Sequence, residues 1–109
     1  MSIYISLMMA IVFEVIGTLL LPVSNNFTKL IPTLALIASY TLSFYLLTYV
    51  TQKLPIAVVY ATWSGMGIVL ISVLGYVFHK QPLNGPVILG LTLTIIGVVM
   101  VHSYSEQLQ

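Results

Sequence analysis

Four long apolar stretches occupy most of this chain. A helix needs about 20 mostly apolar residues to cross the hydrocarbon core of a membrane. Four stretches reach that length, at residues 3–21, 31–50, 56–78 and 87–104. Short connectors with proline or asparagine separate them, and Pro22 with Ser24, Asn25 and Asn26 is expected to end the first. Alternation with a period of two, the pattern of a membrane β-barrel, is absent. The sequence therefore predicts one all-α membrane domain over residues 1–109, with four transmembrane helices.

The composition excludes several classes of function. Charged residues make up 5% of the 109 residues, whereas a soluble domain of this length carries about 27 of them. A net charge of +1 gives no basis for binding nucleic acid. The absence of cysteine excludes disulfides, thiol catalysis and cysteine-ligated zinc. His79 and His102 are far apart in sequence, so no metal site is expected. No nucleophile–base pair or phosphate-binding loop indicates an enzyme.

The lysines give almost no preference for one orientation in the membrane. Four spans place both termini and Lys53 on one side, and Lys29 and Lys80 on the other. One lysine against two is nearly balanced, which predicts dual topology, with copies inserting both ways. The alternative is that this small difference, or the lipids, fixes one orientation. Because four helices enclose little room, we expect an oligomer, and opposite insertion makes the smallest one an antiparallel dimer.

Glu14 is the acidic residue deep inside the first span, about 17 Å of helical rise from Ile3. An ionised side chain there costs about 2.5–3.5 kcal/mol, so it is a functional candidate by default. The alternative is a structural glutamic acid that stays protonated and hydrogen-bonded to a neighbouring helix. No second charged residue in the spans could pair with it. With a second copy's Glu14, it could hold protons and release them when a cation arrives.

The spacing of the first span places several residues on the face that carries Glu14. Intervals of three and four residues keep side chains on one side of a helix. Small residues beside this face allow another helix to approach closely, so the carboxylate is expected to point into the bundle rather than at lipid. The face comprises Tyr4, Leu7, Ile11, Glu14 and Thr18, flanked by Ala10, Gly17 and Leu21.

Aromatic residues on the third span suggest a cation site. Tyr60, Trp63 and Gly67 share one face, with Ser64 beside them. Trp63 is the only tryptophan and lies inside a span rather than at the membrane interface. Aromatic faces bind weakly hydrated cations with about 0.5–2 kcal/mol per contact. Plain packing is the alternative for such residues, and it is the favoured one for Phe44. The second span has a comparable stripe, made up of Tyr40, Ser43, Phe44 and Leu47.

Two pairs of glycines need a structural reason, because glycine weakens a helix. Gly65 and Gly67 in the third span could permit a bend through which the helix opens, or simply close packing. Gly90 and Gly97 make the fourth span a candidate association helix where two copies meet. Close packing inside one monomer is the alternative for the second pair.

These residues together resemble the small multidrug resistance transporters over essentially the whole chain. The matching pieces are the first-span run 14–18, the run 27–30, the third-span run 60–67, and the Gly90 and Gly97 pair. Jointly and in order they are specific, whereas each alone is weak. Gly17-Thr18 and Trp63-Ser64-Gly65 are more similar to the branch that exports quaternary ammonium compounds than to the branch that exports guanidinium.

The resemblance implies an antiparallel homodimer in a bacterial inner membrane that exchanges protons for aromatic or quaternary ammonium cations. Protons are then the coupling ion, and no cofactor is implied. Glu14 would be the shared proton and substrate site, Tyr60 and Trp63 would contact the cation, and Gly97 would lie at the dimer contact. The remaining pocket would be lined by Tyr4, Leu7, Ala10, Ile11, Thr18, Tyr40, Phe44 and Ser64.

The sequence departs from the family pattern at four loop or span-end positions. Pro22 stands where many relatives have lysine, Asn25 and Asn84 where an acid is common, and Pro82 where a basic residue is frequent. These changes bear on topology and pH response, and leave open a paralogous partner chain. The alternative functions are a guanidinium or polyamine exporter of the same fold, or a structural membrane protein such as a rotor-ring subunit or a holin.

Overall fold

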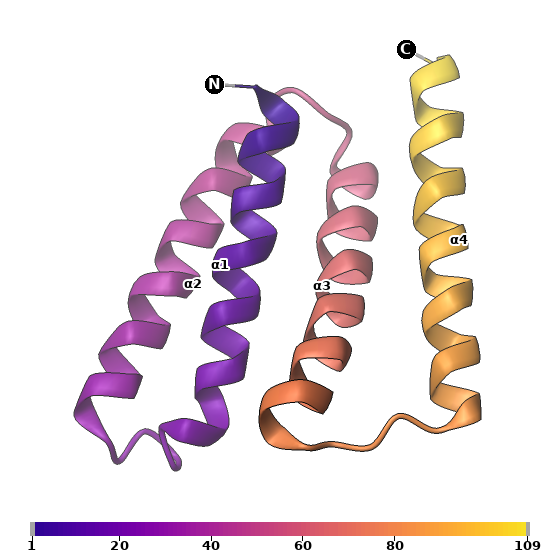
Figure 1. The fold of residues 1–109 in the computed structure, drawn as a ribbon. Coiled ribbons are helices and arrows are strands. Elements are labelled where there is room, and N and C mark those ends of the chain that lie inside the picture. Colours follow the sequence, from indigo (N-terminus) through magenta and orange to yellow (C-terminus); the bar gives the residue numbers. More distant parts are fainter. Residues whose placement is uncertain (1, 109) are drawn as a thin grey trace. The chain divides into compact units, whose positions relative to one another are not determined.

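The computed structural model describes residues 2–108, with side chains described up to residue 103. It contains four α-helices: α1 Ile3–Val23, α2 Leu30–Thr51, α3 Ile56–His79 and α4 Gly85–Leu108 (Figure 1). Each contains a stretch long and apolar enough to cross a membrane. No strand occurs in residues 2–108. The expected fold class of an all-α protein with four transmembrane helices is therefore confirmed, while the dimer and the single-domain organisation stay predictions.

The helices form two hairpins, which are described separately. The first comprises residues 1–54 with α1 and α2, and the second comprises residues 55–109 with α3 and α4. Within each hairpin a short loop joins two consecutive helices, so they run antiparallel. The spans are helical because lipid cannot satisfy exposed backbone groups, which a helix pairs internally.

Pro22 lies inside the last turn of α1, which ends at Val23, two residues beyond the expected end of the span at residue 21. Proline in the last turn removes only the bond to the carbonyl of Thr18, and its fixed φ suits a helix. Ser24, one of the residues expected to end the span, is the C-cap of the helix. Its backbone N–H donates to the Leu20 carbonyl, and its hydroxyl donates to the carbonyl of Leu21 at 2.8 Å.

The fourth helix begins two residues before the expected span. The side-chain Oδ1 of Asn84 accepts a hydrogen bond from the backbone N–H of Val87 at 3.0 Å. This is the N-cap interaction for which asparagine is favoured, since it satisfies one of the unpaired N–H groups of a helix start. Asn84 thus caps the start of α4.

The loop between α1 and α2 contains a left-handed turn. Asn25, Asn26 and Phe27 have φ values of 50°, 59° and 65°. Asparagine tolerates this region through its short polar side chain, whereas a bulky residue such as phenylalanine is strained there. The backbone N–H groups of Thr28 and Lys29 both donate to the carbonyl of Ser24. These bonds reverse the chain between the two helices.

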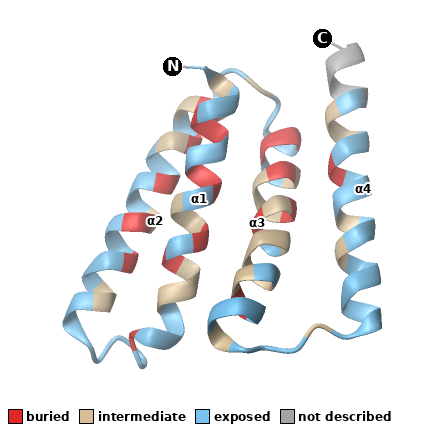
Figure 2. Ribbon diagram, in the orientation of Figure 1, coloured by how far each residue is buried: buried red, intermediate tan, exposed pale blue. Residues whose placement is uncertain are grey.

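The core of the first hairpin lies between α1 and α2, where the buried faces of the two helices meet (Figure 2). Ser43 is fully buried, and its hydroxyl donates to the backbone carbonyl of Ala10 at 2.7 Å. Hydroxyl bonds of this kind join helices in lipid, where apolar packing alone gives little preference for protein over lipid contacts. The buried apolar residues are Leu7, Ala10, Ile11 and Val15 from α1, and Leu36, Leu47 and Val50 from α2.

The second hairpin depends on one glycine for the approach of its helices. A Cβ atom added at Gly65 would lie 2.5 Å from Cγ2 of Val98 and 3.4 Å from Cγ2 of Thr94. Any larger residue would therefore displace α4 or the Val98 side chain. Close packing, one of the two explanations offered for Gly65, is present within this hairpin. Most of the described side chains of α4 are nevertheless exposed (Figure 2).

Candidate functional site

Glu14 lies in the middle of α1 within a chain of hydrogen bonds. The Thr18 hydroxyl donates to Oε1 of Glu14 at 2.8 Å. The oxygen of the same hydroxyl lies 2.7 Å from the Tyr40 hydroxyl of α2. Since the single hydrogen of Thr18 goes to the carboxylate, the Tyr40 hydroxyl is the donor in the second bond. Glu14 is thereby tied to both helices of the first hairpin.

Gly17 has no side chain, and this lets the Tyr40 ring approach α1 closely. Gly17 is buried, and a Cβ atom added there would lie 3.3 Å from three atoms of the Tyr40 ring. That distance is tighter than ordinary van der Waals contact, so a larger side chain would push the phenol away from Thr18. The helix face predicted from the spacing therefore brings Glu14, Thr18 and Gly17 together with Tyr40.

A second link from α2 reaches the same turn of α1. The Ala10 carbonyl, which accepts from Ser43, precedes Glu14 by four residues and is the usual acceptor for its backbone N–H. Ser43 therefore holds the turn that carries the carboxylate. The sequence placed Ser43 on the stripe with Tyr40, but its carbonyl partner could not be predicted, because any backbone carbonyl of a facing helix offers the same acceptor.

The predicted aromatic residues of α3 form a pair in the second hairpin. The ring centroids of Tyr60 and Trp63 are 6.0 Å apart, and the rings meet edge to face at 81°. The hydroxyl of Ser64 donates to the Tyr60 carbonyl at 2.5 Å. This edge-to-face arrangement is a favourable one for two aromatic rings. That these rings face Glu14 stays a prediction.

The other predicted site residues differ in exposure. Leu7, Ala10 and Ile11 are buried in the core of the first hairpin. Tyr4 and Phe44 are 51% and 53% exposed, so neither is a core residue of its own hairpin. Gly67 is buried on α3. Whether the exposed residues line a pocket stays a prediction.

Gly90 and Gly97 lie on an open surface of α4. A Cβ atom added at either position would meet nothing within 4 Å, and both residues are exposed. Within the described part of the second hairpin, neither glycine packs closely against another helix. This hairpin therefore does not support the alternative of close packing inside one monomer. The dimer contact assigned to this pair stays a prediction.

One polar pair was missed from the sequence. Thr62 of α3 and Nε2 of His102 on α4 are hydrogen-bonded partners. Thr62 lies between Tyr60 and Trp63 in the sequence and is 8% exposed. Helical periodicity could not indicate this pair, because the two residues are 40 positions apart. The sequence did place one polar residue, Thr62, on the side of α3 away from the aromatic pair, and this could have indicated a polar contact with another helix.

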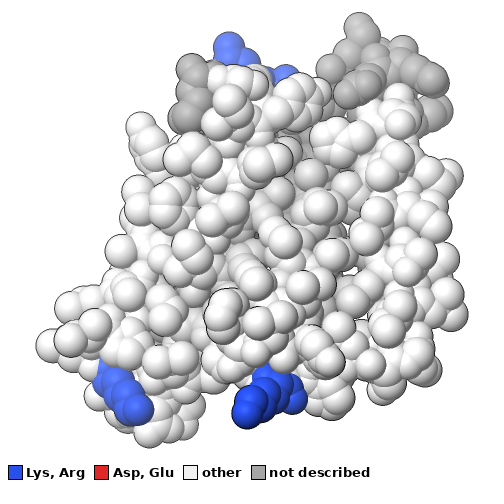
Figure 3. All heavy atoms as spheres, viewed as in Figure 1, with Lys and Arg blue, Asp and Glu red and all other residues white. Residues whose placement is uncertain are grey.

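Charge is confined to the helix ends on the face that Figure 3 shows, where lysine side chains lie at the two edges of an uncharged surface. Lys29 is the N-cap of α2 and Lys80 the C-cap of α3, while Lys53 follows the end of α2. Among the described residues no group of three histidine, cysteine or acidic side chains could hold a metal ion.

Residues 2–102 match the family described as Small Multidrug Resistance protein. The chain belongs to this family. It is 44% identical over 106 residues to the multidrug transporter EmrE of Escherichia coli (strain K12), covering 97% of this chain and 96% of that protein. It is 41% identical over 101 residues to the quaternary ammonium compound-resistance protein QacC of Staphylococcus aureus, covering 93% and 94%.

A third relative comes from Bacillus subtilis. The uncharacterized membrane protein YvaE of Bacillus subtilis (strain 168) is 42% identical over 99 residues, covering 91% of this chain and 83% of that protein. The predicted family is thus confirmed. Four spans and these relatives make the chain a multi-pass bacterial membrane protein, and its family is one of transporters rather than enzymes.

Proposed function

We propose that this chain is a proton-coupled antiporter that exports quaternary ammonium and other lipophilic cations as an antiparallel homodimer. The observation that carries the proposal is the Glu14 carboxylate, which lies in the middle of a membrane span and accepts a hydrogen bond from Thr18. Ionisable groups at such a depth mark proton, ion or substrate pathways. The name of QacC, a quaternary ammonium compound-resistance protein, supports substrates of this class, and the name of EmrE supports multidrug transport.

Glu14 binds either a proton or a cation, and this competition couples the two. A carboxylate has about four lone-pair positions, and the Thr18 hydroxyl occupies one of them. The remaining positions accept a proton or face a positive charge, but a protonated carboxyl no longer attracts a cation. Cation binding therefore releases protons, and proton binding releases the cation.

The aromatic pair of α3 supports organic cations as the substrates. Quaternary ammonium groups have no N–H donor, so a carboxylate holds them by charge alone. Tyr60 and Trp63 add cation–π contacts of about 0.5–2 kcal/mol each. Small guanidinium or polyamine cations gain less from ring faces and more from hydrogen-bond acceptors, so this pair favours bulkier, weakly hydrated substrates.

The direction of transport follows from the proton gradient. Protons that enter from outside occupy Glu14 and displace the cation outward, and deprotonation toward the inside lets the next cation bind. In an antiparallel pair the inward-open and outward-open states are nearly equal in energy, so small differences in contacts suffice for alternation.

The test is proton release from detergent-solubilised protein when tetraphenylphosphonium is added at constant pH. We expect the wild type to release protons, and its cation affinity to rise from pH 5 to pH 9 as Glu14 loses its proton. Glu14→Gln should abolish both signals while the protein still inserts and folds. Glu106→Gln, a change in the other acidic residue of the chain, is the matched control and should behave as wild type.

Other outcomes separate the alternatives. If Glu14→Gln bound tetraphenylphosphonium as the wild type does, or if wild-type binding were equal at pH 5 and pH 9, the competition would be refuted. Displacement of tetraphenylphosphonium by micromolar guanidinium or polyamine would favour an exporter of those metabolites. Absence of any cation binding by the wild type would favour a structural protein.

A further inference from the structure

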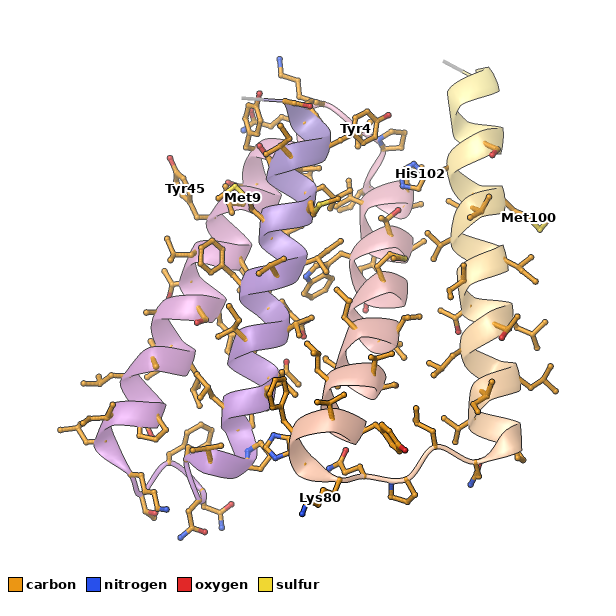
Figure 4. The ribbon with its side chains drawn as sticks, viewed as in Figure 1. Tyr4, Met9, Tyr45, Lys80, Met100 and His102 are labelled. Atoms are coloured by element: carbon orange, nitrogen blue, oxygen red, sulfur yellow. The ribbon has the colours of Figure 1, made fainter. Side chains whose placement is uncertain are left out.

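His102 and Thr62 join α4 to α3 at a place that the proposed exchange does not use. Figure 4 shows the His102 imidazole reaching from α4 toward the neighbouring end of α3, where Nε2 is hydrogen-bonded to Oγ1 of Thr62. His102 is half-buried, and Thr62 is 8% exposed. Both residues lie in stretches apolar enough to span the membrane, at Ile56–His79 and Gly85–Ser103.

His102 is an ionisable residue at the end of its membrane-spanning stretch, and its hydrogen bond ties it to a buried residue of the neighbouring helix. Histidine is also the side chain whose charge ordinarily changes between pH 5 and pH 8. We propose that His102 is a second proton-binding site of this chain, with the Thr62 hydroxyl holding its imidazole against α3. The proposal concerns proton binding alone and does not depend on cation exchange at Glu14.

Proton binding at His102 fixes the direction of the hydrogen bond to Thr62. A neutral imidazole has one N–H, so Nε2 either accepts from the hydroxyl or donates to it. The added proton, taken from water, leaves both ring nitrogens as donors, and the Thr62 oxygen can then only accept. The hydroxyl hydrogen turns to another acceptor, for which a helical threonine has the carbonyls three or four residues earlier, those of Val59 and Val58. The bond between the helices is kept.

The pair also connects proton binding to the turn of α3 that carries the aromatic residues. Thr62 directly precedes Trp63, and Tyr60 lies two positions earlier. A charge on His102 strengthens the hydrogen bond to Thr62, because a charged donor makes a stronger bond than a neutral one. This turn of α3 is therefore held more firmly against α4 when the site is protonated.

The other ionisable groups of this hairpin are placed as follows. Tyr60, two positions from Thr62, points to another side of α3, since residues two apart do not share a helix face. Tyr76, His79 and Lys80 lie at the opposite end of α3. On α4, Tyr104 and Glu106 follow His102 closely in sequence, and their side chains lie outside the described residues.

The experiment is a pH titration of ¹⁵N-labelled histidine, followed by nuclear magnetic resonance in lipid nanodiscs without any cation substrate. His102→Asn assigns the two imidazoles, and His79 is the internal control. We expect His102 to bind a proton between pH 5 and pH 8. Thr62→Val should lower the proton affinity of His102 about fivefold, because removing the hydroxyl costs the charged ring more hydrogen-bond stabilisation than it costs the neutral ring. The affinity of His79 should stay unchanged.

Thr62→Ser keeps a hydroxyl and should keep the His102 proton affinity within about twofold of the wild type, which separates the hydrogen bond from packing. The titration should persist in Glu14→Gln, so failure of the exchange proposal leaves this result intact. The proposal is overturned if His102 stays neutral from pH 5 to pH 8. It is also overturned if Thr62→Val leaves the proton affinity of His102 unchanged.

Discussion

Gly65 offers the most direct test of how the second hairpin packs. In Gly65→Ala the new Cβ lies 2.5 Å from Cγ2 of Val98, far inside van der Waals contact. Overpacking of this kind costs about 1–3 kcal/mol. Alanine recovers about 1 kcal/mol of helix propensity relative to glycine, so the net loss of folding free energy is smaller than the clash. A single variant therefore underestimates the steric effect.

A double-mutant cycle isolates the clash from the propensity. Val98→Ala removes the Cγ2 atom that the new methyl group would meet, so Gly65→Ala should be better tolerated in that background. We expect a coupling of about 1–3 kcal/mol between the two substitutions. That corresponds to about a 5- to 150-fold difference in the unfolding equilibrium constant. Gly85→Ala, where the added Cβ meets nothing within 4 Å, is the control for propensity without a clash.

The assay is equilibrium unfolding in mixtures of dodecyl maltoside and sodium dodecyl sulfate, followed by the fluorescence of Trp63, the single tryptophan. All four variants of the cycle are measured under one condition. A coupling below about 0.5 kcal/mol, the level at which independent sites add, would refute the claim that α3 approaches α4 through Gly65.

Two further changes test the first hairpin. Thr18→Val removes the hydroxyl that donates to Glu14, so the pH dependence of tetraphenylphosphonium binding should change. Thr41→Val, which removes a hydroxyl bonded to the Ile37 carbonyl, should leave it as in the wild type. Phe27→Gly relieves the left-handed backbone of an exposed residue and should increase the free energy of unfolding by about 1 kcal/mol in the detergent assay; a decrease would contradict the strain argument.

The local sequence was sufficient to predict the helices and part of the site. Hydropathy locates the four spans because each must match the thickness of the same apolar core. The interval of four residues between Glu14 and Thr18 predicts one face, and the structure joins them by a hydrogen bond. Pro22 shows the limit of such rules, because a proline disrupts the interior of a helix more strongly than its last turn.

The sequence by itself determined that this chain is a four-span membrane protein with one deep carboxylate and an aromatic turn on the third span. Composition and periodicity along one helix suffice for this, because lipid imposes the same solvent requirement on every span. Only the tertiary structure decided that Tyr40 donates to Thr18, that Gly65 fits against Val98, and that Thr62 holds His102. These contacts join different helices, and their register depends on side-chain shape across an interface, which no periodicity within a single helix encodes.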